Sequence, residues 1–218
     1  MPEKVGVVGL GLMGSVLASK LIAAGYEVHG YDIDEARVAA LKAGGGIPVG
    51  NPSEAAKDAS FVVLSLLNSD IVKEVCFGQG GIVQSAREGL VVIDTTTARP
   101  EDSIETAEKL RELGFSFLDT SLSGSRNDIV ALAGGDEGDL KKARPIIDTF
   151  ARSCHYMGPN GAGARTKLIV NLISGLNRLV MAEGLVFGMK AGMEMESLLE
   201  VLLDTSAYSK ALASRGKR

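Results

Sequence analysis

The sequence predicts an α/β fold, in which a Rossmann-like, doubly wound and mostly parallel sheet is followed by an all-α domain. Short apolar runs alternate with helical patterns through residue 158, as is typical of strands and crossover helices in a parallel sheet. A glycine motif separates the first apolar run from the first helical pattern. Beyond residue 158 only helical patterns follow, so we expect two domains, residues 1–158 and residues 159–218.

Composition narrows the class of protein. The chain has 218 residues, of which 45% are hydrophobic, and a formal net charge of −4, which disfavours nucleic acid as a partner. The two cysteines, Cys76 and Cys154, lack the spacing of a metal site or a disulfide framework, so no metal is expected. Since neither a signal-peptide pattern nor a long apolar span is evident, we expect a soluble, cytoplasmic protein that does not bind membranes.

The first elements predict a βαβ unit. Residues 4–8 form an apolar run typical of a buried strand, a helical pattern ends at Gly25, and a second strand over residues 27–31 ends at Asp32. This is the context in which a glycine motif binds a dinucleotide. The motif consists of Gly9, Leu10, Gly11, Leu12, Met13 and Gly14.

Each part of this unit has a chemical role. The glycines permit a tight turn and let a pyrophosphate approach the backbone, while the helix N-terminus supplies free N–H groups. A carboxylate at Asp32 accepts hydrogen bonds from the ribose hydroxyls of adenosine and repels a 2′-phosphate. The adjacent Ile33 and Asp34 offer no arginine for that phosphate, so NAD is favoured over NADP. In the alternative interpretation, Asp34, or Asp32 itself, caps the helix that starts near Glu35. Asp34 can cap while Asp32 binds, so the two interpretations are compatible.

Strand–helix alternation continues along the chain. The carboxyl ends of the strands, where ligands gather, bring residues 66–68, 95–97 and 119–125 near the glycine motif. Residues 121–125 contain three serines and a glycine and are expected to form a turn, which either holds a carboxylate or is an ordinary serine-rich turn. The predicted strands span residues 61–66, 90–94, 115–118, 129–133 and 154–157, and the predicted helices residues 71–76, 100–113 and 139–150.

A glycine-rich turn at residues 158–163 leads into the longest helical pattern, which runs to Gly192 and precedes a shorter helix over residues 194–203. Lys167 and Asn171 are four residues apart, so they share one side of the long helix and suggest a polar site. The other positions are apolar almost all round, which requires burial on every side. We therefore expect self-association, as a homodimer or a higher oligomer, through this helix.

Lys167 by itself is interpreted as a solvated lysine on the helix surface. His29 and His155 both fall within predicted strands, where a structural role is expected.

Four motifs in this order resemble the β-hydroxyacid dehydrogenase family, the group of 3-hydroxyisobutyrate dehydrogenase and tartronate semialdehyde reductase. The glycine motif with Met13 is similar to the family's GLGxMG, and Asp-Thr-Thr-Thr at residues 94–97 is similar to its D-x-S-T segment. Residues 119–125 resemble its D-A-P-V-S-G-G substrate loop. Residues 158–171 resemble its G-x-x-G-x-G-x-x-x-K-x-x-x-N signature.

The resemblance implies an NAD-dependent oxidoreductase that transfers a hydride between NAD(H) and a small β-hydroxyacid or semialdehyde. It implies that Lys167 is the catalytic acid/base residue and that Asn171 orients the substrate. A free lysine titrates near pH 10.4, so this role near neutrality needs a pKa lower by roughly 3 units. Partial burial and a positive nicotinamide ring both lower the pKa. The implied contacts are Ser123, Gly124 and Ser125 for the substrate and Leu66, Leu67 and Thr97, besides the glycine motif and Asp32, for the cofactor. A Rossmann domain followed by a helical substrate and dimerisation domain is implied as well.

The sequence departs from the family pattern in three places. Ser125 replaces the second glycine of the substrate loop, and the segment to Gly134 is short. The sequence ends at Arg218, where the family continues with helices that carry a second lysine in a K-D-x-x-L-A motif. We therefore expect a fragment or a shortened relative with an incomplete helical domain. Two alternatives stay open: an imine reductase or 6-phosphogluconate dehydrogenase-like relative, and a non-catalytic cofactor-binding remnant.

Overall fold

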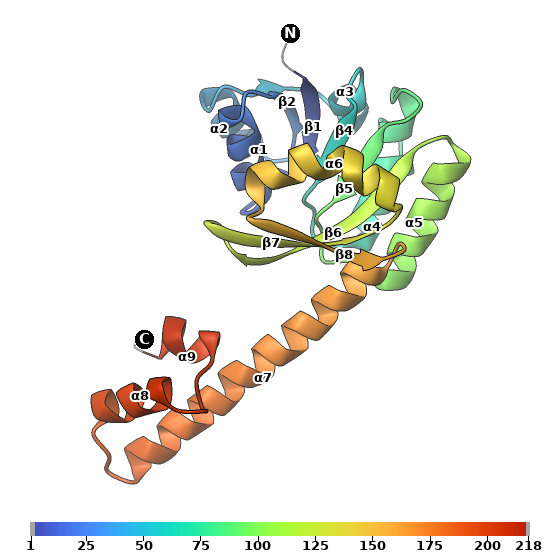
Figure 1. The fold of residues 1–218 in the computed structure, drawn as a ribbon. Helices are drawn as coiled ribbons and strands as arrows, with labels where there is room; N and C mark the ends of the chain where they lie inside the picture. Colours follow the sequence, from blue (N-terminus) through green and yellow to red (C-terminus); the bar gives the residue numbers. More distant parts are fainter. Residues whose placement is uncertain (1–2, 217–218) are drawn as a thin grey trace. The chain divides into compact units, whose positions relative to one another are not determined.

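The computed structural model describes residues 3–216 (Figure 1). The chain divides into two compact units, of which the first ends at Lys167 and the second begins at Leu168. Helix α7 (Ala162–Lys190) crosses this boundary. The first unit thus combines the strand–helix alternation with the first turns of the long helix.

The first unit is built on an eight-stranded sheet with the order β3-β2-β1-β4-β5-β6-β7-β8. Neighbouring strands are parallel, apart from the antiparallel pair β6 and β7. The chain winds outward from β1 in both directions, so the predicted doubly wound, mostly parallel sheet is confirmed. The strands are β1 (Lys4–Val8), β2 (Glu27–Tyr31), β3 (Ile47–Pro48), β4 (Phe61–Leu64), β5 (Val91–Asp94), β6 (Ser116–Ser125), β7 (Asp128–Gly134) and β8 (Ser153–Gly158).

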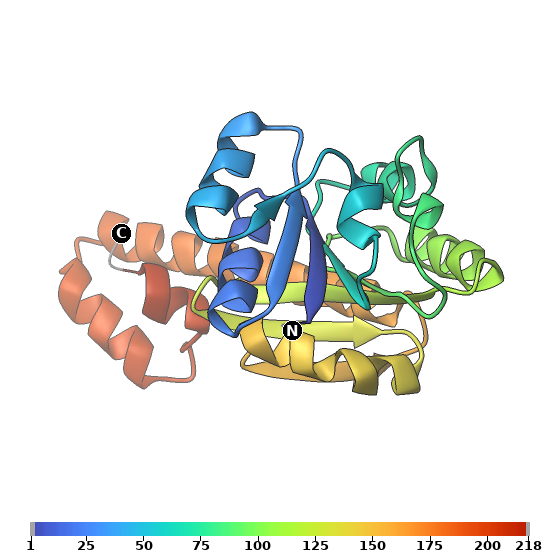
Figure 2. The same cartoon turned by 90° about the horizontal axis from the view of Figure 1, so that it is seen from above.

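Helices cover both faces of the sheet. α6 lies on one face, and α4 and α5 lie on the other (Figure 2). Asp34 caps α2 as predicted, since its carboxylate accepts a hydrogen bond from the Ala36 N–H at 2.9 Å. The helices of this unit are α1 (Gly14–Ala23), α2 (Glu35–Ala43), α3 (Pro52–Ala56), α4 (Ser69–Phe77), the 3-10 helix η1 (Ile82–Gln84), α5 (Pro100–Glu112), α6 (Glu137–Phe150) and the start of α7.

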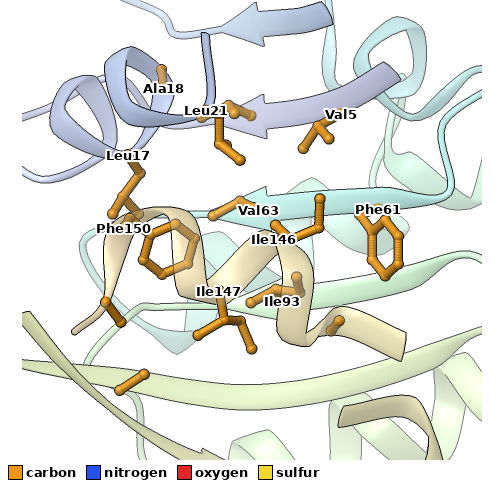
Figure 3. Close-up of a cluster of buried hydrophobic side chains, with 14 of the residues drawn as sticks. Val5, Leu17, Ala18, Leu21, Phe61, Val63, Ile93, Ile146, Ile147 and Phe150 are labelled. Atoms are coloured by element: carbon orange, nitrogen blue, oxygen red, sulfur yellow. The ribbon is translucent and has the colours of Figure 1, made fainter. Parts of the chain in front are cut away.

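Two apolar layers hold these helices on the sheet, because successive strand residues point to opposite faces. On one face, Val63 and Ile93 lie in a cluster with Leu17 of α1 and Phe150 of α6 (Figure 3). On the other face, Val62 packs with residues of α3, α4 and α5. Both faces of the central strands are therefore buried, which explains their continuous apolar runs.

The predicted turn over residues 121–125 is wrong. These residues continue β6, which is ten residues long and pairs with β7 from Asp119–Gly134 to Ser125–Asp128. A serine-rich sequence forms a strand here because the hairpin partner satisfies its backbone groups. The φ angle of Gly124 is +109°, and a Cβ atom there would lie 1.9 Å from the Asp128 carbonyl oxygen. Glycine at this position is therefore required by the hairpin itself.

Smaller differences concern strand ends. β4 ends at Leu64 instead of residue 66, so Leu66 lies in the loop that follows. β3, α3 and η1 were not predicted, because each has at most five residues and gives little periodic signal.

The second unit contains the rest of α7, α8 (Met195–Asp204) and α9 (Lys210–Arg215). By length and composition alone, α7 is long and apolar enough to cross a membrane. The expectation that the chain lacks a long apolar span is therefore wrong, although a core helix of a soluble protein has the same length and composition. The exposed large apolar residues of α7 are Leu168, Ile169, Leu172, Ile173, Leu176, Leu179, Val180, Val186, Phe187 and Met189.

Candidate active site

The glycine motif forms the turn between β1 and α1. Gly9 has a φ angle of +89°, and a Cβ atom at Gly14 would lie 1.8 Å from the Gly9 carbonyl oxygen. Met13 is the N-cap residue of α1, and its side chain makes no capping hydrogen bond. The first turn of α1 contains no acidic residue. No side chain therefore caps the N-terminus of α1, and a ligand can approach the backbone of the glycine turn closely. Such a helix N-terminus can bind an anionic group such as a pyrophosphate.

Asp32 lies directly behind this turn. Its Oδ2 atom accepts a hydrogen bond from the Leu10 N–H at 2.6 Å, and its Oδ1 atom accepts one from the Asp34 N–H at 2.9 Å. The side chain is only 5% exposed. These two hydrogen bonds hold the carboxylate in one orientation. The remaining lone pairs of its two oxygen atoms can accept hydrogen bonds from a ligand.

Arg37 is a neighbour of Asp32 that the sequence interpretation missed. Its Nη1 atom lies 3.4 Å from Asp32 Oδ2, and its Nε atom lies 3.2 Å from Asp34 Oδ2. The expectation considered only residues next to Asp32 in sequence, whereas the first turns of α2 return Arg37 to it. Its side chain is 49% exposed, so a cation is present where the sequence analysis expected none.

A first cavity of about 300 Å³ opens over the glycine turn. It contains most of the predicted cofactor residues: Gly9, Gly11, Leu12, Met13, Asp32, Leu66 and Leu67. Arg37 and Ile33 line it as well. Two further motif residues do not: Leu10 is buried and contributes its N–H to Asp32, and Gly14 is buried in the turn.

A second cavity of about 310 Å³ shares Met13, Ser65 and Leu66 with the first. It brings together Thr97 from the loop after β5, Ser123 and Gly124 from β6, and Lys167 from α7. Thr95, Thr96, Leu122 and Ile129 complete its lining. Residues predicted from three separate motifs therefore converge on one cavity, beside the one over the glycine turn.

Two predicted residues are not among those that line this cavity. Ser125 is exposed at the hairpin end and does not line it. Asn171 belongs to the second unit, four residues beyond Lys167 along α7. Thr96 lies in the segment 95–97 that was expected at this edge of the sheet, whereas Ser65 lines the cavity but was not expected there, because it was assigned to the preceding strand.

The Lys167 ammonium group is half-buried, and burial lowers its pKa from the usual value. Among residues 3–216 it forms no hydrogen bond or ion pair. Desolvation without a compensating carboxylate favours the neutral amine. A lysine in this state accepts a proton from a bound ligand more readily than a solvated lysine does.

Loops at the strand ends are tied together beneath the cavity. The Leu66 N–H donates to Thr96 Oγ1 at 3.1 Å, and the Thr95 hydroxyl donates to the Leu64 carbonyl oxygen at 2.6 Å. Asp94, which precedes these threonines, is 1% exposed. The loops after β4 and β5 therefore form one rigid wall of the site.

The fold and the glycine turn define a dinucleotide-binding domain. Residues 4–158 match the family model described as the NAD binding domain of 6-phosphogluconate dehydrogenase. Residues 161–218 match the model described as NAD-binding of NADP-dependent 3-hydroxyisobutyrate dehydrogenase.

Individual relatives agree with both models. The chain is 30% identical to 2-(hydroxymethyl)glutarate dehydrogenase of Eubacterium barkeri over 217 residues, 97% of this chain and 72% of the relative. It is 31% identical to 3-sulfolactaldehyde reductase of Escherichia coli (strain K12) over 205 residues, 92% of this chain and 69% of the relative. A solved Mycobacterium tuberculosis 3-hydroxyisobutyrate dehydrogenase with L-serine is 25% identical, with a TM-score of 0.92 over 100% of this chain and 76% of that one. The chain belongs to the β-hydroxyacid dehydrogenase family, a family of NAD(P)-dependent oxidoreductases.

Asp94 gives the site a pH-dependent stability. Burial raises its pKa from 3.8 to about 7, against the opposing effect of its hydrogen bonds with Thr96, and the nearby charge of Asp119 adds to the rise. Between these two pH values the folded protein binds a proton that the unfolded chain releases. The free energy of unfolding therefore falls as the pH rises through this window.

Asp94→Asn is expected to remove this dependence, because the amide stays neutral and still offers an oxygen to the Thr96 N–H. At pH 8 the variant should be more stable than the unmodified protein by at most about 4 kcal/mol, and at pH 4 the difference should be small. Urea unfolding followed by circular dichroism measures both. If the stability of the two proteins depended on pH in the same way, Asp94 would have the same pKa in the folded and the unfolded protein, which contradicts the prediction.

Proposed function

We propose that this protein transfers a hydride between NAD(H) and a small β-hydroxyacid or its semialdehyde, with Lys167 as the acid/base residue. The observation that carries the proposal is a half-buried lysine, unpaired within residues 3–216, in one cavity with Ser123 and Gly124. That cavity adjoins the one over the glycine turn. A redox cofactor and a substrate in these two cavities would be neighbours.

The residues divide the work. When bound, the cofactor supplies the nicotinamide that takes up or delivers the hydride. Lys167 removes the hydroxyl proton during oxidation and returns a proton to the carbonyl oxygen during reduction. Ser123 and Gly124 hold the substrate carboxylate, and Asn171, one helical turn beyond Lys167, orients the substrate. Leu66, Leu67 and Thr97 contact the cofactor.

The glycine turn fits a dinucleotide for a steric reason. Side chains at Gly9 or Gly14 would collide with backbone oxygen atoms, whereas a Cβ atom at Gly11 would meet only the Arg37 guanidinium at 3.6 Å. The turn is therefore accessible to a ligand at Gly11, whereas Gly9 and Gly14 face backbone atoms of the protein. The pyrophosphate would approach the open side, over the uncapped start of α1.

Substrate class is supported by the relatives. The named relatives act on hydroxymethylglutarate and sulfolactaldehyde, which are small molecules with an acidic group and an alcohol or aldehyde. A panel of small hydroxyacids and semialdehydes, assayed with NAD(H) by the absorbance of the reduced nicotinamide, tests the proposal. No turnover of any panel member would favour the cofactor-binding alternative.

Lys167→Ala should lower kcat by about 10²–10⁴-fold, while the Kd for NAD(H) changes by less than about twofold because the lysine lies outside the cavity over the glycine turn. Stopped-flow or steady-state assays give kcat, and calorimetric titration gives Kd. Lys141→Ala, on the exposed surface of α6, is the matched control. If turnover of the Lys167 variant stays within a few-fold, the proton must be carried by another group.

Cofactor preference is a separate proposal: NAD(H) binds more tightly than NADP(H), because the Asp32 carboxylate repels a 2′-phosphate. Asp32→Asn should narrow the difference. Arg37→Gln should widen it, because the guanidinium beside Asp32 is the cation available to a 2′-phosphate. Calorimetric titration of all three proteins with both cofactors measures this. Equal or tighter NADP(H) binding by the unmodified protein would contradict the assignment of Asp32.

We further propose a cytoplasmic enzyme that self-associates through α7 between Ala164 and Lys190, where the exposed large apolar residues extend from Leu168 to Met189. Light scattering at micromolar concentration should give a dimer or larger species, and Leu172→Glu combined with Leu179→Glu should shift it towards monomer. Asn177→Glu, a polar position on the same helix, is the control. A monomer in the unmodified protein, or co-sedimentation with lipid vesicles, would contradict this use of the helix.

A further inference from the structure

The start of α7 is held by a carboxylate from another element. α7 has no acidic residue in its first turn. Instead, Asp119 of β6 accepts a hydrogen bond from the Gly161 N–H at its Oδ1 atom and one from the Ala164 N–H at its Oδ2 atom, both at 2.9 Å. Two backbone donors that the helix cannot satisfy are thus paired with a negative charge, which also complements the helix dipole.

Glycines make this approach possible. Gly161 has a φ angle of +89°, which presents its N–H to Asp119 at little steric cost. A Cβ atom at Gly163 would lie 2.2 Å from the Asp119 carbonyl oxygen and 2.5 Å from that of Leu132. One at Gly134 would lie 2.7 Å from Asp119 Oδ1. The helix start, the carboxylate and two strands therefore fit together without space for a side chain.

A second contact fixes the same turn. The Asn160 amide donates to the Phe117 carbonyl oxygen of β6 at 2.8 Å. Asp119 is buried, and burial raises its pKa while the hydrogen bonds from Ala164 and Gly161 act against the rise. A buried carboxylate with two N–H partners is a rigid anchor, because loss of either partner leaves a desolvated polar group unpaired.

The anchor connects the two sides of the proposed site. Asp119 precedes Ser123 by four residues on β6, and Ala164 precedes Lys167 by three residues on α7. We infer that Asp119 is a positioning residue, which sets where the Lys167 amine stands relative to Ser123 and Gly124. The inference rests on the proposed function for its catalytic consequence, but the anchoring itself is testable without turnover.

Asp119→Asn is the first test. An asparagine offers one oxygen, so one of the two N–H groups must face its NH₂ group. The kcat should fall by about 100-fold, as for a misplaced catalytic group, with the NAD(H) Kd within about twofold of the unmodified value. The pH midpoint of kcat should stay in place, because burial alone lowers the pKa of Lys167. A midpoint shifted without any change in amide exchange over residues 159–166 would mean that Asp119 acts through its charge, and would overturn positioning.

Two readouts do not depend on activity. Backbone amide exchange over residues 159–166 should accelerate by at least about tenfold in the variant, and trinitrobenzenesulfonate labelling of Lys167, followed by peptide mass spectrometry, should change in rate. Asp136→Asn is the matched control, because Asp136 caps α6 with the same type of hydrogen bond and lies outside the site residues. It should leave kcat and Lys167 labelling unchanged.

The unmodified protein supplies a test that needs no variant. The Gly161 and Ala164 amides should exchange slowly, like those of the central strands, although they precede or begin a helix. Rapid exchange there, or unchanged labelling and kcat in a folded Asp119→Asn protein, would overturn the inference. If the unmodified protein turns over no substrate, the proposed function fails, while exchange and labelling still decide whether Asp119 positions Lys167.

Discussion

Close approach of helix starts to the sheet is the constraint on which this unit depends. At α1, Gly14 packs so near the Gly9 carbonyl that no side chain fits. At α7, Gly163 does the same against Asp119 and Leu132. Both contacts require the missing Cβ atom. The glycines of the two motifs are therefore needed for packing in the first place. The positions of the residues in the candidate site depend on that packing.

The two helix starts differ in how their polar groups are satisfied. No capping side chain or first-turn acid neutralises α1, which leaves its positive end for a ligand. The start of α7 is neutralised within the protein by Asp119. The uncapped start of α1 can bind a ligand anion reversibly. The start of α7 is already paired with Asp119, which holds this helix, and with it Lys167, in one position.

Much of the fold could be predicted from sequence because the central strands are buried on both faces. Runs such as residues 4–8 and 91–94 then have a strong apolar signal and clear ends. The prediction failed at residues 121–125, where the strand is specified by pairing with β7 instead of by its own composition. Local sequence contains no record of a partner strand, so serine and glycine were interpreted as a turn.

Asp32 and Lys167 line the two cavities, as expected from the motifs that contain them, and their chemical roles stay predictions. The candidate site was not predictable where tertiary structure brings a residue in. Arg37 reaches Asp32 only because the first turns of α2 fold back. Asp119 was recognised as part of a motif, but its bonds to residues more than forty positions away cannot be read from spacing.

The hairpin of β6 and β7 extends beyond its neighbours. β5 pairs with β6 only from Ser116 to Asp119, and β8 pairs with β7 only from Val130 to Gly134. Only the tip, where Gly124 and Ser125 pair with Ile129 and Asp128, is therefore a two-stranded ribbon, and Ser123 directly precedes it. Residues can be added to or removed from its end without changing the register of the main sheet. In the proposed function, a change in the length of this ribbon would alter the size of the substrate accepted beside Ser123 and Gly124, while the turn between β1 and α1 stays as it is.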